Sequence, residues 1–316
     1  MPGKYRYLFG PVPSRRFGRS LGVDLSKPKT CSLDCIFCQL GRTKETCIER
    51  KEYVPAAEVI SELKDWLATN GEADYITLSG SGEPTLHSRF GEVLEFIREN
   101  SDIPALLLTN GTMLYLPEVR KGASHASIVK VSLSGWDDAS YGLVNRPHPA
   151  LRFDMLVEGE KAFRREYTGT LFLEVFLIKG INAAPEDVKK IAELAKGIAP
   201  DRVQLNTAVR PPAEVSALPL AREEMEALST LFDPPAEIIA EFKAKPESHF
   251  YASRDAILAM LKRRPCTGEQ IGEVFGMHMN EVSKYLGKLT RSQQVVTERR
   301  DGMTYYAARS DGEETA

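Results

Sequence analysis

The sequence lacks several features that would place it in a specialised class of protein. It holds no apolar run long enough to span a bilayer, and its N-terminal segment has no apolar core typical of a signal peptide. A net charge of −3 gives the chain no overall attraction to nucleic acid or to an anionic membrane. We therefore expect a cytoplasmic protein without membrane association.

Cysteine is also scarce, with 5 thiols in 316 residues. Three of them crowd into one short segment, while Cys47 and Cys266 stand apart. This distribution does not indicate a disulfide framework. It suits a reducing compartment, in which thiolates stay available for metal. A chain of this length predicts about two domains.

The three crowded thiols are Cys31, Cys35 and Cys38, spaced C-x3-C-x2-C in the run KTCSLDCIFCQLG. Three thiolates can hold three irons of a cubane cluster and leave the fourth iron without a protein ligand. An iron with an open position can bind and activate a small molecule. A structural zinc wants four nitrogen or sulfur ligands, and Cys47 could be the fourth, so zinc or a closed cluster remains the alternative.

Short apolar segments alternate with amphipathic helical patterns along most of the chain. Strands are expected at 20–25, 74–80, 103–109, 128–134, 170–178 and 201–206. Helices are expected at 56–69, 87–100, 114–120, 151–166, 185–197 and 222–231. The alternation predicts a parallel sheet in an open, partial (β/α)6 barrel, whose functional residues gather at the strand C-termini. The cysteine segment directly follows the first of these strands.

The C-terminal part of the chain has a different pattern. We expect the barrel at 1–235, a linker at 236–250, a small winged helix-turn-helix domain at 251–309 and a disordered tail at 310–316. Within the small domain, three helices (254–264, 267–275 and 278–291) precede a hairpin that turns at Asp301-Gly302. Thr267 and Gln270 predict a capping box at the start of the second helix.

The cysteine motif and the run SGSGEPTL after the second strand together resemble the radical S-adenosylmethionine (SAM) superfamily, over about residues 8–210. The resemblance implies a 4Fe–4S cluster that binds SAM and splits it reductively. The product would be a 5′-deoxyadenosyl radical, which abstracts hydrogen from an unidentified substrate, either a modified nucleoside or a peptide. An electron donor of the flavodoxin or ferredoxin type is expected as a partner.

The same resemblance assigns roles to particular residues. It makes the three cysteines of the motif the cluster ligands. It places cofactor contacts at Phe37, Gly80, Ser81, Gly82, Glu83, Asn110, Ser132, Ser134 and Asn206. The structural alternative for the glycine run is an ordinary strand-to-helix turn, and Glu174 could be a plain polar strand residue.

The runs GPVPSRRFGRSLGVDL and SLSGWDDASYGLVNRPHP resemble a narrower branch, the Fe–S oxidoreductases related to wyosine synthases. Those enzymes resemble two-cluster proteins with extra N-terminal cysteines, whereas no cysteine precedes Cys31 here. This departure puts tRNA chemistry in doubt. Arg15, Arg16 and Arg19 could bind an anionic substrate group or pair with acidic surface residues, and both readings stay open.

Residues 254–309 carry ten basic and six acidic side chains, so the small domain is positive while the remainder carries −7. Basic residues recur on its third helix (Lys284, Lys288, Arg291) and near the hairpin turn. They suit contact with nucleic acid, although winged helices also bind proteins. The alternative function is therefore a winged-helix regulator whose cluster senses redox state. The glycine run favours the enzyme, because a sensor has no need to bind SAM.

Overall fold

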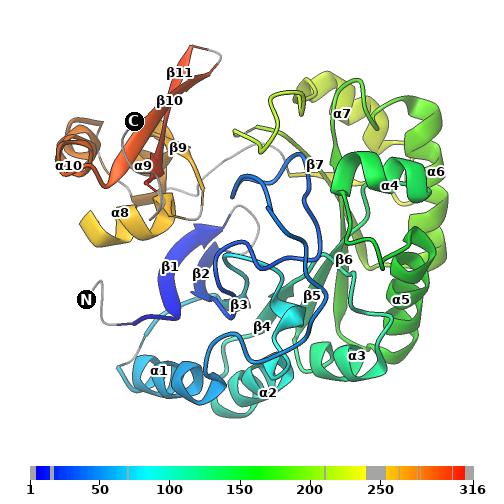
Figure 1. The fold of residues 1–316 in the computed structure, drawn as a ribbon, viewed down its shortest axis with the longest axis horizontal. Helices are drawn as coiled ribbons and strands as arrows, with labels where there is room; N and C mark the ends of the chain where they lie inside the picture. Colours follow the sequence, from blue (N-terminus) through cyan, green and yellow to red (C-terminus); the bar gives the residue numbers. More distant parts are fainter. Residues whose placement is uncertain are drawn as a thin grey trace.

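The computed structural model shows a larger barrel unit and a smaller C-terminal unit (Figure 1). The residues it describes are 5–14, 18–69, 71–209, 211–239, 254–262, 264–275, 277, 279–300 and 302–309. The expectations for Arg15, Arg16, Asp301, most of the linker and the tail fall outside these residues.

The barrel unit is built on one sheet of eight strands that follow one another in sequence order. Six parallel strands form its centre: β2 (Gly18–Val23), β3 (Tyr75–Leu78), β4 (Ala105–Leu108), β5 (Ile128–Ser132), β6 (Thr170–Leu177) and β7 (Arg202–Thr207). They coincide with the six predicted strands, and the partial (β/α)6 barrel is confirmed.

Two edge strands extend this sheet beyond the prediction. β1 (Leu8–Ser14) pairs antiparallel with β2, and the short β8 (Glu237–Ile238) pairs parallel with β7. The barrel unit thus reaches at least Ile238, past the expected boundary at 235. Prolines at both places conceal the strands in the sequence, since proline argues against a central strand but suits an edge.

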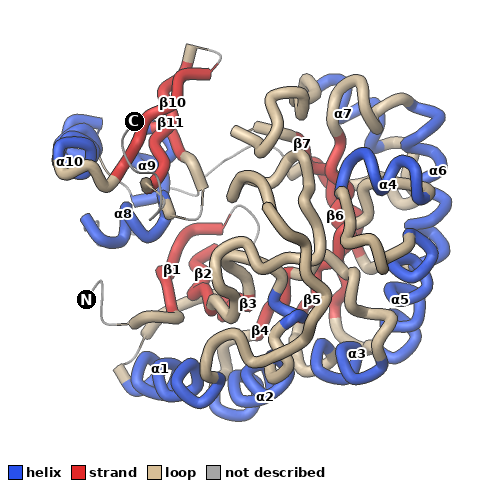
Figure 2. The backbone as a smooth tube through the Cα atoms, in the orientation of Figure 1, coloured by secondary structure: helices blue, strands red, loops and turns tan. Residues whose placement is uncertain are grey.

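Helices cover the outer face of the sheet (Figures 1 and 2). They are α1 (Ala56–Ala68), α2 (Phe90–Asn100), α3 (Pro117–Ala123), α4 (Asp138–Asn145), α5 (Phe153–Glu166), α6 (Pro185–Ile198) and α7 (Arg222–Ser229), with a 3-10 turn η1 at Pro84–Leu86. The sequence analysis missed α4. It begins at a capping box in which Ser140 N–H donates to Asp137 Oδ1 over 2.7 Å and Asp137 N–H donates to Ser140 Oγ over 3.0 Å.

Alternation along the strands separates the helix-covered core from the inner face of the barrel. On β5, Val129 and Val131 are fully buried in the main core. The neighbouring Lys130 points to the other face, where it pairs with Glu174 of β6. Glu174 also accepts a hydrogen bond of 2.7 Å from Asn206 of β7. A polar line therefore crosses three adjacent strands on the inner face.

The C-terminal unit has its own core and its own antiparallel sheet. Its elements are α8 (Arg254–Leu261), β9 (Cys266–Thr267), α9 (Gly268–Phe275), α10 (Met279–Arg291), β10 (Val295–Arg300) and β11 (Met303–Ala308), with strand order β10-β11-β9. The predicted capping box is confirmed, since Gln270 N–H donates to Thr267 Oγ1 and Thr267 N–H to Gln270 Oε1. The helices and hairpin lie in the predicted order; the winged-helix class itself stays a prediction.

α8 of the small unit contacts β1 at the edge of the barrel (Figure 1). None of the described helices combines the length and apolar character that crossing a membrane requires.

Candidate functional site

The cysteine segment is an irregular loop that leaves the C-terminal end of β2 and crosses the ends of the neighbouring strands (Figure 2). Its backbone is bound to the last turn of α4 and to the segment that follows it. Leu33 forms an isolated bridge with Pro147, and Ile36 N–H donates to the Val144 carbonyl over 3.1 Å. The loop thus takes its shape from a partner more than a hundred residues away, because it has no regular structure of its own.

Each sulfur of the loop accepts a hydrogen bond from a different nitrogen. The pairs are Asn110 Nδ2 with Cys31 at 3.6 Å, Asn145 Nδ2 with Cys35 at 3.2 Å, and Lys29 Nζ with Cys38 at 3.4 Å. Such donors stabilise sulfur that carries negative charge, as the thiolate ligands of an iron–sulfur cluster do. Lys29 and Asn145 were not predicted, and no local motif marks them.

The three thiols also lie close enough to affect one another electrostatically. Burial, together with smaller contributions from the charges of Glu83 and Cys38, raises the pKa of Cys31 to about 12. Burial likewise raises the pKa of Cys35, with added contributions from Cys31 and Cys38. Cys31 and Cys35 therefore hold their protons at neutral pH, so a cation must displace these protons when it binds.

The surroundings of the loop bear on the zinc alternative. Across the described ranges, no three His, Cys, Asp or Glu side chains converge enough to hold a single metal ion. A cubane has its irons at separate corners, so its ligands spread more widely than those of one zinc ion. Cys47 comes close through its backbone, donating to the Cys31 carbonyl, but its thiol lies 3.3 Å from the Tyr53 hydroxyl. The contact with Tyr53 sets the Cys47 thiol apart from the other three.

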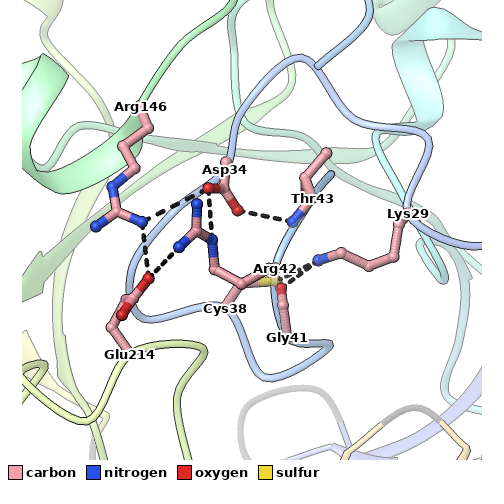
Figure 3. Close-up of polar contacts among 8 residues, drawn as sticks. All are labelled: Lys29, Asp34, Cys38, Gly41, Arg42, Thr43, Arg146 and Glu214. Carbon is pink, nitrogen blue, oxygen red and sulfur yellow. Dashed lines mark hydrogen bonds and ion pairs between the residues drawn. The ribbon is translucent and has the colours of Figure 1, made fainter. Parts of the chain in front are cut away.

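An ion-pair clamp fixes the far side of the loop (Figure 3). Asp34 is buried and accepts from Thr43 N–H at 2.7 Å and from Arg42 Nε at 2.8 Å. Glu214 pairs with Arg42 and, over 2.8 Å, with Arg146. Arg146 also approaches Asp34 to 3.6 Å. We call Asp34, Arg42, Arg146 and Glu214 the loop clamp; it joins three segments distant in sequence.

The glycine run after β3 lies directly against the start of the cysteine loop. A Cβ on Gly82 would stand 2.0 Å from the Thr30 carbonyl oxygen. Gly80 has φ +156°, and a Cβ there would meet the carboxylate of Asp24. Ser81 donates through both N–H and Oγ to that same carboxylate. The two glycines are therefore required by close packing within the protein.

Glu83 carries a buried carboxylate that organises the turn after β4. It accepts hydrogen bonds from Thr85, from Thr109 Oγ1 at 2.6 Å and from Asn110 N–H at 2.7 Å. Burial raises the pKa of Glu83, and these hydrogen bonds oppose the rise. The side-chain amide of Asn110 donates to Ser32 Oγ and to the Cys31 sulfur. By holding the Asn110 backbone, the Glu83 carboxylate helps to orient this amide.

The remaining predicted residues lie at the same end of the barrel. Ser134 Oγ accepts from Phe176 N–H at 3.2 Å, and the ring of Phe37 stacks on Phe176 with centroids 3.9 Å apart. Asn206 is bound to Glu174, while Ser132 ends β5 beside Glu174. The side chains of Ser134, Asn206 and Glu83 are thus engaged inside the protein, a role that their position at strand ends could not reveal.

Comparison with known proteins agrees with this geometry. The family model described as the radical SAM superfamily matches residues 25–195. A radical SAM methyltransferase from Sphaerobacter thermophilus shares the fold, with a TM-score of 0.53 and 16% identity over 72% of this chain and 67% of that one.

Two curated relatives align over nearly the whole chain. The UPF0026 protein MJ1312 of Methanocaldococcus jannaschii is 31% identical over 94% of both chains. A protein named GTPase Obg from Brachyspira hyodysenteriae is 38% identical over 96% of this chain, which spans only 45% of that protein.

The chain belongs to the radical SAM superfamily, a class of enzymes that uses a 4Fe–4S cluster and SAM. Within that class it belongs with the UPF0026 proteins, which it matches from end to end. The narrower resemblance to wyosine synthases stays a prediction.

Proposed function

We propose that this enzyme cleaves SAM reductively at a cluster held by Cys31, Cys35 and Cys38. The observation that carries the proposal is the set of three neighbouring thiols, each with its own nitrogen donor, at the C-terminal edge of the parallel sheet. When bound, the cluster and SAM would supply a 5′-deoxyadenosyl radical able to take hydrogen from a substrate.

The protein's own residues would orient the cofactors and exclude water from them. The run Gly80–Glu83 packs against the loop and brings its backbone beside the cysteines, where peptide carbonyls could accept from the SAM ammonium group. The inner-face line of Lys130, Glu174 and Asn206 offers charged and amide groups for the carboxylate, ribose or adenine. Ser132, Ser134 and Phe37 lie at the same end of the barrel and complete the proposed pocket.

The test is anaerobic reconstitution with iron and sulfide. We expect about four irons per chain, a broad sulfur-to-iron charge-transfer band, and formation of 5′-deoxyadenosine and methionine after reduction. Replacing Cys31, Cys35 or Cys38 by alanine should abolish all three signals. Cys47→Ala is the matched control and should keep them. SAM cleavage that survives in all three loop variants would refute the proposal.

The substrate and the electron donor belong to the same proposal. A modified nucleoside remains the first candidate class and a peptide the second. A distant relative, the dual-specificity RNA methyltransferase RlmN of Caulobacter vibrioides, is 24% identical over 60% of this chain, which supports a nucleic acid substrate. Flavodoxin or ferredoxin would deliver the electron. Nucleoside profiling of a deletion strain, with loss of one modified nucleoside as the expected result, tests the first class.

A second proposed function is contact with nucleic acid through the C-terminal unit. Lys284, Lys288 and Arg291 lie exposed at helical spacing on α10, and none of them pairs with an acidic residue among those described. In the barrel, by contrast, most described arginines form ion pairs, for example Arg42 and Arg89. Unneutralised cations on one helix face suit a phosphate backbone.

The redox-sensing regulator remains the alternative to the enzyme. It would show DNA binding that changes with the oxidation state of the cluster and no turnover of SAM. A gel-shift against genomic fragments with cluster-loaded and cluster-free protein distinguishes the two, because an enzyme gives 5′-deoxyadenosine whether or not DNA is present.

A further inference from the structure

Three buried polar side chains behind the cysteine loop have unsatisfied oxygens. Within the described part of the chain, five buried side-chain atoms find no hydrogen-bond partner, and four of them belong to this group: Tyr141 OH, Asn145 Oδ1, and Glu160 Oε1 and Oε2. Glu160 is 0% exposed, Tyr141 2% and Asn145 4%. Buried polar atoms are nearly always paired, so their concentration in one place calls for a cause.

The three residues come from two neighbouring helices. Tyr141 and Asn145 are four residues apart on α4 and so share one face of it, while Glu160 projects from α5, which contacts α4. The Glu160 carboxyl lies against the turn after β4, since a Cβ on Gly111 would stand 2.5 Å from Oε1. The Tyr141 hydroxyl lies within electrostatic range of both Glu160 and Cys35.

The side-chain amide of Asn145 connects these three residues to the cysteine loop. Asn145 directs its Oδ1 away from any described donor, while its Nδ2 donates to Cys35 Sγ over 3.2 Å. A donor delivered to Oδ1 would polarise the amide and strengthen the bond that Nδ2 makes to sulfur. Glu160 can be that donor only as a neutral acid, and burial raises its pKa well above the ordinary value.

We propose that Glu160, Tyr141 and Asn145 enclose an internal water site, in which the neutral carboxyl of Glu160 starts a hydrogen-bond relay that ends on the Cys35 sulfur. Water suits the site because it can donate and accept among oxygens that belong to different elements. The relay makes Glu160 and Tyr141 positioning residues. Its effect is to stabilise the reduced, more negative cluster and so to raise its reduction potential. This effect rests on the proposed function, whereas the water site does not.

The first test uses cluster-free protein and so is independent of catalysis. The infrared spectrum at neutral pH should show the carbonyl stretch of a protonated carboxylic acid that shifts in D2O and is absent from Glu160→Gln. A crystal structure should show ordered water within hydrogen-bonding distance of the Glu160, Tyr141 and Asn145 oxygens. An ionised Glu160, or three oxygens that remain dry, would overturn the site.

The second test measures the midpoint potential of the reconstituted cluster by EPR-monitored redox titration. Glu160→Leu and Tyr141→Phe should shift the potential to more negative values at unchanged iron content. Glu160→Gln keeps a neutral donor of the same shape and should stay close to the wild type. Glu158→Leu is the matched control, because Glu158 lies on the same helix with its side chain 65% exposed.

The variants also separate the possible failures. If Glu160→Leu keeps the wild-type potential, the relay does not tune the cluster and the proposal is overturned. If the acid band is present but the chain holds no cluster, the proposed function fails while the water site stands. Since Glu160→Gln introduces no cavity, a potential that moves in this variant as far as in Glu160→Leu would also count against the relay.

Discussion

At the scale of single residues, the thiols of the loop are tuned by burial. In cluster-free protein, Cys31 should be alkylated at pH 8 on the order of 1,000-fold more slowly than an unstructured thiol, because its raised pKa leaves little thiolate. The rate should keep climbing above pH 9 toward pH 12. Mass spectrometry of labelled peptides measures it, and a profile that levels off near pH 9 would contradict the assigned environment.

The raised thiol pKa also predicts the direction in which the stability of the folded protein changes with pH. A thiol whose pKa is raised by folding binds its proton more tightly in the folded protein than in the unfolded chain. Cluster-free protein should therefore lose stability as the pH rises above the ordinary thiol range.

Glycine at position 82 is required by a backbone contact. Gly82→Ala should displace the cysteine loop, because the added Cβ would overlap the Thr30 carbonyl, and the variant should reconstitute with less iron than the wild type. Gly142→Ala on α4 is the matched control, since a Cβ there meets nothing within 4 Å. The control should gain roughly 0.5–1 kcal/mol of stability. Equal iron content in both variants would show that the cysteine loop can shift to accommodate the added Cβ and still bind iron.

At the scale of elements, the loop clamp holds the cysteine loop against α4 and the 214 segment. Asp34→Asn should weaken the bonds to Arg42 and Thr43 and lower the free energy of unfolding by roughly 1.5–3 kcal/mol, the range for hydrogen bonds to a charged group. Denaturant unfolding measures it, and cluster loss on dilution should quicken in parallel. Asp154→Asn, which alters an exposed carboxylate that pairs with Arg152, should stay within about 0.5 kcal/mol of the wild type.

The elements also show what the sequence can and cannot predict. Apolar runs such as ITL and LLL allowed the parallel strands to be predicted, because the strands of a buried parallel sheet form nearly continuous hydrophobic segments. The cysteines were found by their spacing, and the glycine run by its resemblance to a motif of the radical SAM superfamily. Asn145 and Glu214 were not predicted as site residues, because they act through tertiary contacts and no local sequence motif accompanies them. Helix α4 was missed because Asp137, which caps it, comes soon after Ser134-Gly135. Those two residues were already assigned to the end of the preceding strand.

At the scale of the whole molecule, charge is unevenly distributed between the two units. Lys284→Glu with Lys288→Glu should weaken RNA or DNA binding and reduce the slope of log affinity against log salt by about 2, one for each lost phosphate contact. The control is Lys189→Glu with Lys196→Glu on α6, which makes the same charge change on an exposed barrel surface. Fluorescence anisotropy measures both. Equal losses of affinity in the two double variants would show that the effect comes from net charge alone.

The way the cysteine loop is fastened bears on how the protein is made. Its three thiols leave the ribosome early, but the residues that hold the loop in place, at 144–148 and at 214, follow more than a hundred positions later. A nascent chain would therefore expose unprotected thiols through most of its synthesis. We therefore expect the loop to reach its folded shape only after translation has passed residue 214, so that a cluster would be inserted into the completed polypeptide.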